Sequence, residues 1–108
     1  MSDPKLVEDK LSLLQDKYIN SLPDKITDIK QAWSHCKSSK TITEKSLESM
    51  LHKLAGSAGM YDLYELGEQA RALELSIITP EPALTDETIQ TFDDGLDVLK
   101  DMVAELSD

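Results

Sequence analysis

Hydrophobic positions along the chain recur at intervals of three and four residues, which is the period of an amphipathic helix. The apolar positions fall into five stretches: Val7, Leu11, Leu14 and Tyr18; Leu22, Ile26, Ile29, Trp33 and Cys36; Leu47, Met50, Leu51, Leu54 and Ala58; Leu66, Ala70, Leu73 and Ile77; and Ile89, Phe92, Leu96, Leu99, Val103 and Leu106. No stretch shows the two-residue alternation that is typical of a strand. The pattern therefore predicts five helices and no strands.

Proline is expected to separate the first two helices. A proline inside a helix has no amide hydrogen to donate and clashes with the preceding turn, so Pro23 should begin a second helix over residues 23–37. Short connections favour antiparallel neighbours. We predict an all-α fold, with the last four helices forming an antiparallel four-helix bundle and an additional N-terminal helix flanking one end. Residues 1–108 are expected to form a single domain.

Capping residues set the limits of the later helices. Thr41 with Glu44 fits a capping box at the start of the third helix. Asp62 with Glu65 fits a second box, with Asp62 as the N-cap of the fourth helix. The last helix is expected over residues 86–106.

Composition and charge exclude several classes of partner. The net charge is −10, and nucleic acids and anionic membranes require basic patches, so neither is an expected partner. Cys36 is alone and cannot form an internal disulfide. No apolar run approaches the roughly 18 residues of a membrane span, and the N-terminus has no secretory segment. We therefore expect a cytoplasmic protein, monomeric by default, and Met1 favours a stand-alone chain over an excised domain.

The segment after His52 carries two glycines, which is unusual for a helix. Each glycine in a helix interior costs about 1 kcal/mol relative to alanine. With the apolar stripe facing inward, His52 points to solvent, and Gly56 and Gly59 lie within about 40° of it around the helix. The imidazole then stands above a strip with few side chains, where another protein can approach closely. Tolerated glycines at a helix crossing are the alternative explanation.

An exposed histidine supports a limited range of chemistry. The sequence places no Ser or Cys nucleophile beside His52, and no acidic residue is clearly positioned to orient it. A neutral imidazole can itself be a nucleophile near pH 7. The chain has no phosphate-binding loop of the Walker type and no kinase motif, so we do not expect it to bind ATP. His35 and Cys36 are adjacent rather than at metal-ligand spacing, so no metal site is expected.

The segment from His52 to Glu74 resembles the signature of the histidine-containing phosphotransfer (HPt) domains of bacterial phosphorelays. The matching positions are His52, Leu54, Gly56, Ser57, Ala58, Gly59, Leu66, Leu73 and Glu74. Together with the length and the helical pattern, the resemblance covers essentially the whole chain. It implies that His52 accepts a phosphoryl group through Nε2 from the aspartyl phosphate of a receiver domain, in a response regulator or a hybrid histidine kinase, and relays it to another receiver. It also implies a phosphocarrier rather than an enzyme, with no cofactor of its own and Mg²⁺ held by the receiver.

Two positions depart from the family pattern. Many members have a lysine three residues after the histidine, where it can meet the phosphoryl group, and here that position is Ala55. Lys53 points roughly 100° away from His52, and Lys45 is on the same side but two turns earlier, so the residue that replaces the lysine is not assigned. Many members also have a glycine ten residues after the histidine, where this chain has Asp62. Asp62 can cap the next helix, so this change is expected to be harmless.

The partner surface is expected on the third and fourth helices near His52. Its predicted members are Lys45, Ser49, Lys53, Gly56, Gly59 and Met60. Tyr61 and Tyr64 are expected to add apolar area to it. Gln69 and Arg71 lie on the next helix, where they either border this surface or belong to a solvated face.

Two other functions are compatible with the sequence. One is an acidic helical adaptor or inhibitor that binds a receiver or kinase without being phosphorylated. The other is a purely structural or oligomerisation bundle. The sequence does not identify the receiver, the upstream kinase or the input signal.

Overall fold

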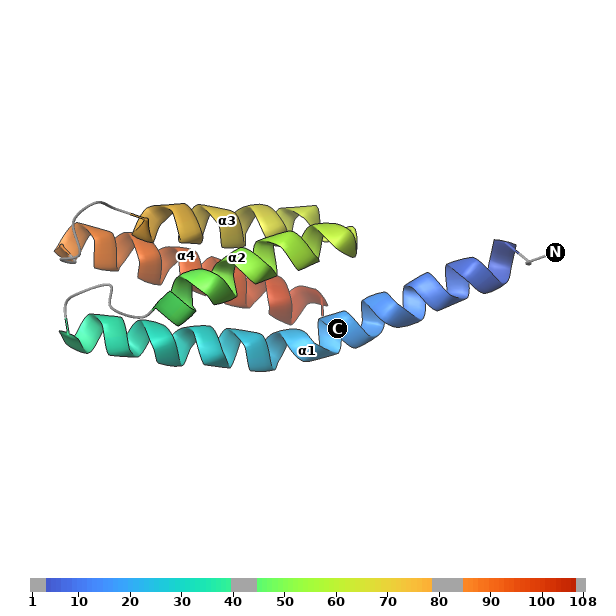
Figure 1. Ribbon diagram of the computed structural model, residues 1–108, viewed down its shortest axis with the longest axis horizontal. Helices are drawn as coiled ribbons and strands as arrows, with labels where there is room; N and C mark the ends of the chain where they lie inside the picture. The colour runs from blue at the N-terminus through green and yellow to red at the C-terminus, as the bar shows by residue number, and fades with distance from the viewer. Residues whose placement is uncertain (1–3, 40–44, 79–84, 107–108) are drawn as a thin grey trace.

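The computed structural model describes residues 4–39, 45–78 and 85–106, and these form an all-helical chain with no strand (Figure 1). The four helices are α1 (Pro4–Ser39), α2 (Lys45–Met60), α3 (Tyr64–Ile77) and α4 (Asp86–Leu106). Successive helices run in opposite directions in Figure 1, and the N-terminal part of α1 extends beyond the other three. The predicted all-α class is confirmed.

The prediction of a separate N-terminal helix is wrong. The first two predicted helices form one helix of 36 residues that passes through Pro23 without a break. Pro23 is exposed, and Leu22 and Ile26 on either side of it are buried in the core. Core packing on both sides of the proline therefore outweighs its local helix-breaking effect. The N-terminal part of α1 bends away from the rest of the helix (Figure 1), and a proline such as Pro23, which has no amide hydrogen to donate to the preceding turn, is a common cause of such a bend.

The core contains the apolar stripes that the sequence predicts. The fully or nearly buried side chains include Leu22, Ile29, Trp33, Cys36, Leu47, Leu51, Leu54, Ala58, Leu66, Ala70, Phe92 and Leu99. The first stretch is different, because of its two described side chains Leu14 is 49% exposed and Tyr18 is buried. The side chains of Val7 and Leu11 lie outside the described residues. Among the described side chains the core therefore begins at Tyr18, and the backbone of the N-terminal part of α1 extends beyond the other helices (Figure 1).

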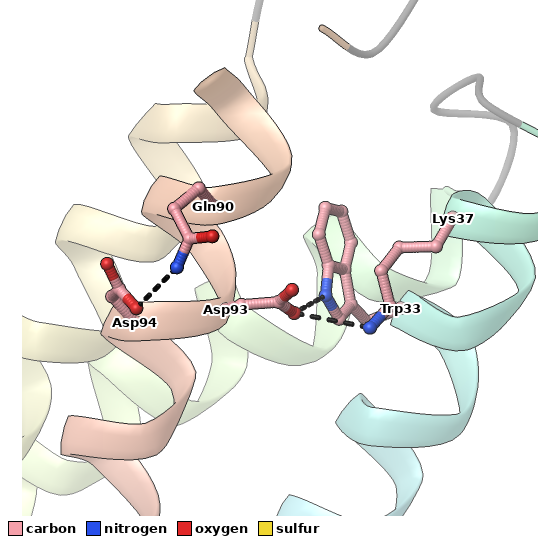
Figure 2. A network of polar contacts seen from close by, with 5 residues as sticks. All are labelled: Trp33, Lys37, Gln90, Asp93 and Asp94. Carbon is pink, nitrogen blue, oxygen red and sulfur yellow. Dashed lines mark hydrogen bonds and ion pairs between the residues drawn. The ribbon is translucent and has the colours of Figure 1, made fainter. Parts of the chain in front are cut away.

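A polar contact joins α1 to α4 at the edge of the core. The Trp33 indole N–H donates a hydrogen bond of 2.7 Å to Oδ1 of Asp93, and the Lys37 ammonium lies 3.3 Å from the same oxygen (Figure 2). The Trp33 ring packs against Phe92 with 4.1 Å between ring centroids. The indole is buried, so its N–H needs such a partner. The contact fixes the C-terminal part of α1 against the N-terminal part of α4.

The turn between α2 and α3 is a Schellman motif. The amide of Leu63 donates to the carbonyl of Ala58 at 2.9 Å, and the amide of Asp62 donates to that of Gly59 at 3.3 Å. Asp62 has a φ of 63°, the left-handed conformation that glycine usually supplies in this motif. The predicted capping box is wrong here, because Leu63 is the N-cap of α3 and makes no side-chain cap. Asp62 instead forms the turn itself, which aspartate tolerates better than most residues.

The first predicted capping box, at Thr41 and Glu44, lies outside the described residues. At the start of α4 a threonine forms the cap, and the amide of Thr88 donates to Oγ1 of Thr85 at 3.1 Å. This helix has the limits that the sequence predicts.

Candidate functional site

His52 lies in the middle of α2 and points to solvent. Its side chain is 71% exposed, while Leu51 and Leu54 on the opposite face of the helix are buried. The apolar stripe anchors α2 to the core and so fixes the direction of the imidazole. The structure therefore presents His52 as helical geometry predicts.

A nearly buried carboxylate from α3 orients the imidazole. Nδ1 of His52 lies 2.9 Å from Oε2 of Glu74, whose side chain is only 9% exposed. An ionised carboxylate can only accept a hydrogen bond, so Nδ1 carries the donated hydrogen. The neutral ring then has its lone pair on Nε2, the nitrogen that faces away from Glu74. The arrangement prepares Nε2 as a nucleophile.

The role of Glu74 is the part of the site that sequence reasoning missed. Glu74 follows Ala70 by four residues and Leu73 by one, so it falls on the buried stripe of α3. A glutamate on a buried stripe requires a partner. That position was the available signal, but periodicity alone does not show that the partner is His52, which is 22 residues earlier on another helix.

The strip beside His52 is open. A Cβ atom added to Gly56 or Gly59 would meet no atom within 4 Å outside the local helix. These glycines are therefore not required by helix packing, which removes the alternative explanation for them. Close packing occurs at Gly67 on α3, where an added Cβ would lie 3.0 Å from the carbonyl oxygen of Ala55. This close approach holds α3 beside the open strip of α2.

Two shallow depressions flank His52. The first lies between α2 and α3 and is lined by His52, Ala55, Gly56, Gly59, Tyr64, Gly67, Glu68 and Arg71. The second is lined by Glu48, Ser49, His52 and Glu74. The imidazole thus separates a depression lined in part by glycines and an alanine from one bordered by two carboxylates.

The other predicted partner residues are distributed unevenly around this site. Ser49 lies in the second depression, and Met60 at the end of α2 is 82% exposed. Lys53 instead lines a groove between α1 and α2 together with Lys25. Lys45 is the first residue of α2, but its side chain lies outside the described residues. Of the predicted set, the structure therefore brings Ser49, Gly56 and Gly59 together with His52, and Lys53 lies apart.

The two tyrosines and Gln69 also have defined places. Tyr64 is 63% exposed and lines the first depression, so it extends the surface around His52 with apolar area. Tyr61 is only partly exposed and stacks on Tyr18, with 4.5 Å between ring centroids. Gln69 donates a hydrogen bond of 2.9 Å to the carbonyl of Gly95 on α4. Gln69 therefore joins α3 to α4 and does not border the site.

Within the described part of the chain, no three His, Cys, Asp or Glu side chains are grouped so as to hold a metal ion. No described helix combines the length and apolar character that a membrane crossing requires. The chemistry visible in the site is that of an exposed, carboxylate-oriented imidazole next to an open surface.

Comparison with known proteins agrees with this geometry. Neither the curated proteins nor the solved structures that were compared with the chain gave a match. The family model described as the Hpt domain matches residues 13–108, which is most of the chain and includes His52, the glycine strip and Glu74. The chain therefore belongs to the Hpt domain family, the phosphotransfer modules of phosphorelays.

Proposed function

We propose that His52 accepts a phosphoryl group from the aspartyl phosphate of a receiver domain and relays it to another receiver. The observation that carries the proposal is the contact between Nδ1 of His52 and the carboxylate of Glu74, which in the neutral ring leaves the lone pair on Nε2 of this exposed side chain. In the transfer, the Nε2 lone pair forms a bond to phosphorus. The bond between phosphorus and the aspartate oxygen breaks, and its electrons remain on the carboxylate. The relay step reverses this with a second aspartate.

Glu74 also contributes to the energetics of the transfer. When Nε2 bonds to phosphorus while Nδ1 keeps its hydrogen, the ring becomes positively charged. The carboxylate of Glu74 lies 2.9 Å from Nδ1, where it stabilises this charge as it develops. Glu74 thus favours the reactive tautomer before transfer and the phosphorylated ring afterwards.

The open strip supplies the surface for docking. Transfer requires the phosphorylated aspartate of a folded receiver to come within bonding distance of Nε2, so the backbones of the two proteins must approach closely. Gly56 and Gly59 leave room for this approach, and the exposed side chains of Met60 and Tyr64 provide apolar contact area nearby. Ser49 borders the same surface, and we assign Lys45 and Lys53 to its periphery.

The remaining features of the proposal concern the whole chain. We infer that residues 1–108 act as a single monomeric phosphocarrier domain in the cytoplasm. The receiver, in a response regulator or a hybrid histidine kinase, supplies Mg²⁺ and most of the catalytic groups. The carrier then needs no cofactor of its own.

A non-phosphorylated adaptor is the competing function, and His52→Gln separates the two. His52 is largely exposed, so the variant is expected to keep its fold and its affinity for a receiver while losing phosphoryl acceptance completely. Circular dichroism, receiver titration and transfer from a phosphorylated receiver provide the three measurements. A wild-type protein that binds phosphorylated receivers and never gains the group would support the adaptor.

A further inference from the structure

We propose that Arg71 of α3 is the cation that contacts the phosphoryl group on His52, in place of the lysine that many family members carry at the position of Ala55. The proposal rests on the function proposed above, and it assigns a role that the α2 sequence leaves open. Arg71 is the only arginine in the chain. It is exposed, and it lines the same depression as His52.

The face of α3 that carries Arg71 is fixed against α2 at two points. Glu74, three residues after Arg71, bonds to His52. Gly67, four residues before it, lies against the backbone at Ala55. Residues three and four apart share one side of a helix, so Arg71 lies between these two contacts. Because neighbouring helices run in opposite directions, this places Arg71 alongside the turn of α2 that links His52 to Gly56.

The depression has room for both a phosphoryl group and a guanidinium. Ala55 and Gly56 contribute at most a methyl group to its lining, and the space beside Gly56 is open to 4 Å. A lysine at position 55 would project from this same turn of α2. Arg71 reaches the space from the opposite helix, and no ion pair holds it against any carboxylate in the described residues, Glu68 of the same lining included.

The side chains around His52 are mainly acidic, so a phosphoryl group there needs a nearby cation, which Arg71 supplies. Three carboxylates, from Glu48, Glu68 and Glu74, line the two depressions that flank the imidazole, and Arg71 is the one cationic side chain in those linings. A phosphoryl group adds a charge of about −1.5 to −2 at neutral pH. Such a group next to three carboxylates requires a compensating cation. The planar guanidinium can donate two parallel hydrogen bonds to phosphoryl oxygens.

The test compares Arg71→Gln, Arg71→Lys and the double variant Arg71→Gln with Ala55→Lys. Lys30→Gln is the matched control, since it removes one positive charge from an exposed position on α1. Each protein is phosphorylated from a phosphorylated receiver and, separately, from phosphoramidate, whose phosphorus–nitrogen bond breaks to release ammonia as Nε2 attacks. The second donor needs no docking surface, so it isolates the contact with the phosphoryl group.

We expect Arg71→Gln to slow phosphorylation about 10- to 100-fold with both donors, the range for losing a hydrogen bond to a charged group. Arg71→Lys should retain part of the rate, and Ala55→Lys should restore much of the rate lost in Arg71→Gln. Loss of the adjacent cation disfavours the phosphoryl dianion. A ³¹P titration of phosphorylated Arg71→Gln should therefore give a phosphoryl pKa above that of the wild type, while Lys30→Gln leaves it unchanged.

Three other outcomes would each overturn the assignment of Arg71. Equal rates and equal phosphoryl pKa values for Arg71→Gln and Lys30→Gln would overturn the assignment while leaving the carrier function intact. A rate loss confined to the receiver donor would also overturn it, because Arg71 would then act only in docking. If the wild-type protein accepts nothing from phosphorylated receivers, the proposed function itself fails, and the assignment fails with it.

Discussion

The contact between His52 and Glu74 determines which nitrogen of the imidazole can react. An exposed histidine without a partner exchanges between two neutral tautomers, and either nitrogen can hold the hydrogen. The buried carboxylate at 2.9 Å selects the tautomer with hydrogen on Nδ1. The same oxygen then stabilises the positive ring that forms on transfer, so one contact serves both steps.

Substitution of Glu74 tests this account. Glu74→Ala should slow phosphoryl acceptance at least about tenfold, because a charged hydrogen bond of roughly 1.5–3 kcal/mol is lost. The rate for Glu74→Gln should lie between those of the wild type and Glu74→Ala, because the amide oxygen of Gln can still accept a hydrogen bond from Nδ1 but carries no charge. Single-turnover transfer gives the rates, and ¹⁵N chemical shifts of the ring report the tautomer. Unchanged rates in both variants, with Glu87→Gln as a control at an exposed site on α4, would contradict a role for Glu74.

Substitutions at Gly56 test its role in folding and its role in docking separately. A Cβ at this position meets nothing, so Gly56→Ala should raise the free energy of unfolding by about 0.5–1 kcal/mol. Gly56→Leu should also fold, but it should slow transfer from a receiver by filling the approach to Nε2. Chemical denaturation and transfer kinetics measure the two effects. Destabilisation by Gly56→Ala would instead show that the glycine is needed for packing.

At the scale of single residues, the sequence identified His52 and the two glycines but not the partner of the histidine. Helical geometry was sufficient to place Gly56 and Gly59 beside His52, because all three lie on one helix. Glu74 and Arg71 come from α3, and their relation to His52 depends on how α3 is rotated against α2. α2 and α3 approach closely at Gly67, but the periodicity of either helix alone does not give this rotation.

At the scale of the helices, the main departure from prediction is the single long α1. Proline is a strong local signal, and its cost inside a helix is about 3 kcal/mol relative to alanine. Leu22, Ile26 and Ile29 lie in the core around and after Pro23, and their burial outweighs that cost. The hydroxyl of Thr27 also donates to the carbonyl of Pro23 at 3.0 Å. The local sequence around Pro23 does not reveal these tertiary contacts, so it could not predict that the helix is continuous.

Replacement of Pro23 should therefore stabilise the protein. Pro23→Ala restores an amide donor to the preceding turn of an already continuous helix. The free energy of unfolding should rise by about 1–3 kcal/mol, and the bend in α1 should decrease. Urea denaturation monitored at Trp33 measures the change, with the exposed Lys30→Ala as a control in the same helix. A loss of stability would show that the bend itself is required for packing.

At the scale of the whole molecule, the sequence predicted the helical class and most of the core. The stripes of α2, α3 and α4 are buried as expected, because each faces the bundle at the helical period. The family match begins at Leu13, close to Tyr18, the first core residue of α1 among the described side chains. The part of α1 before Leu13 thus lies outside the matched region, and it extends beyond the other helices in Figure 1, although its apolar pattern resembles theirs.

The most direct test of the central claim is the intact mass of the protein after incubation with a phosphorylated receiver domain and Mg²⁺. We expect a gain of one phosphoryl group that is labile in acid, stable in base and absent in His52→Gln. We also expect loss of the group when a second, unphosphorylated receiver is added. No gain with several receivers that nevertheless bind, or an equal gain in His52→Gln, would contradict the assignment of His52 as the phosphoryl carrier.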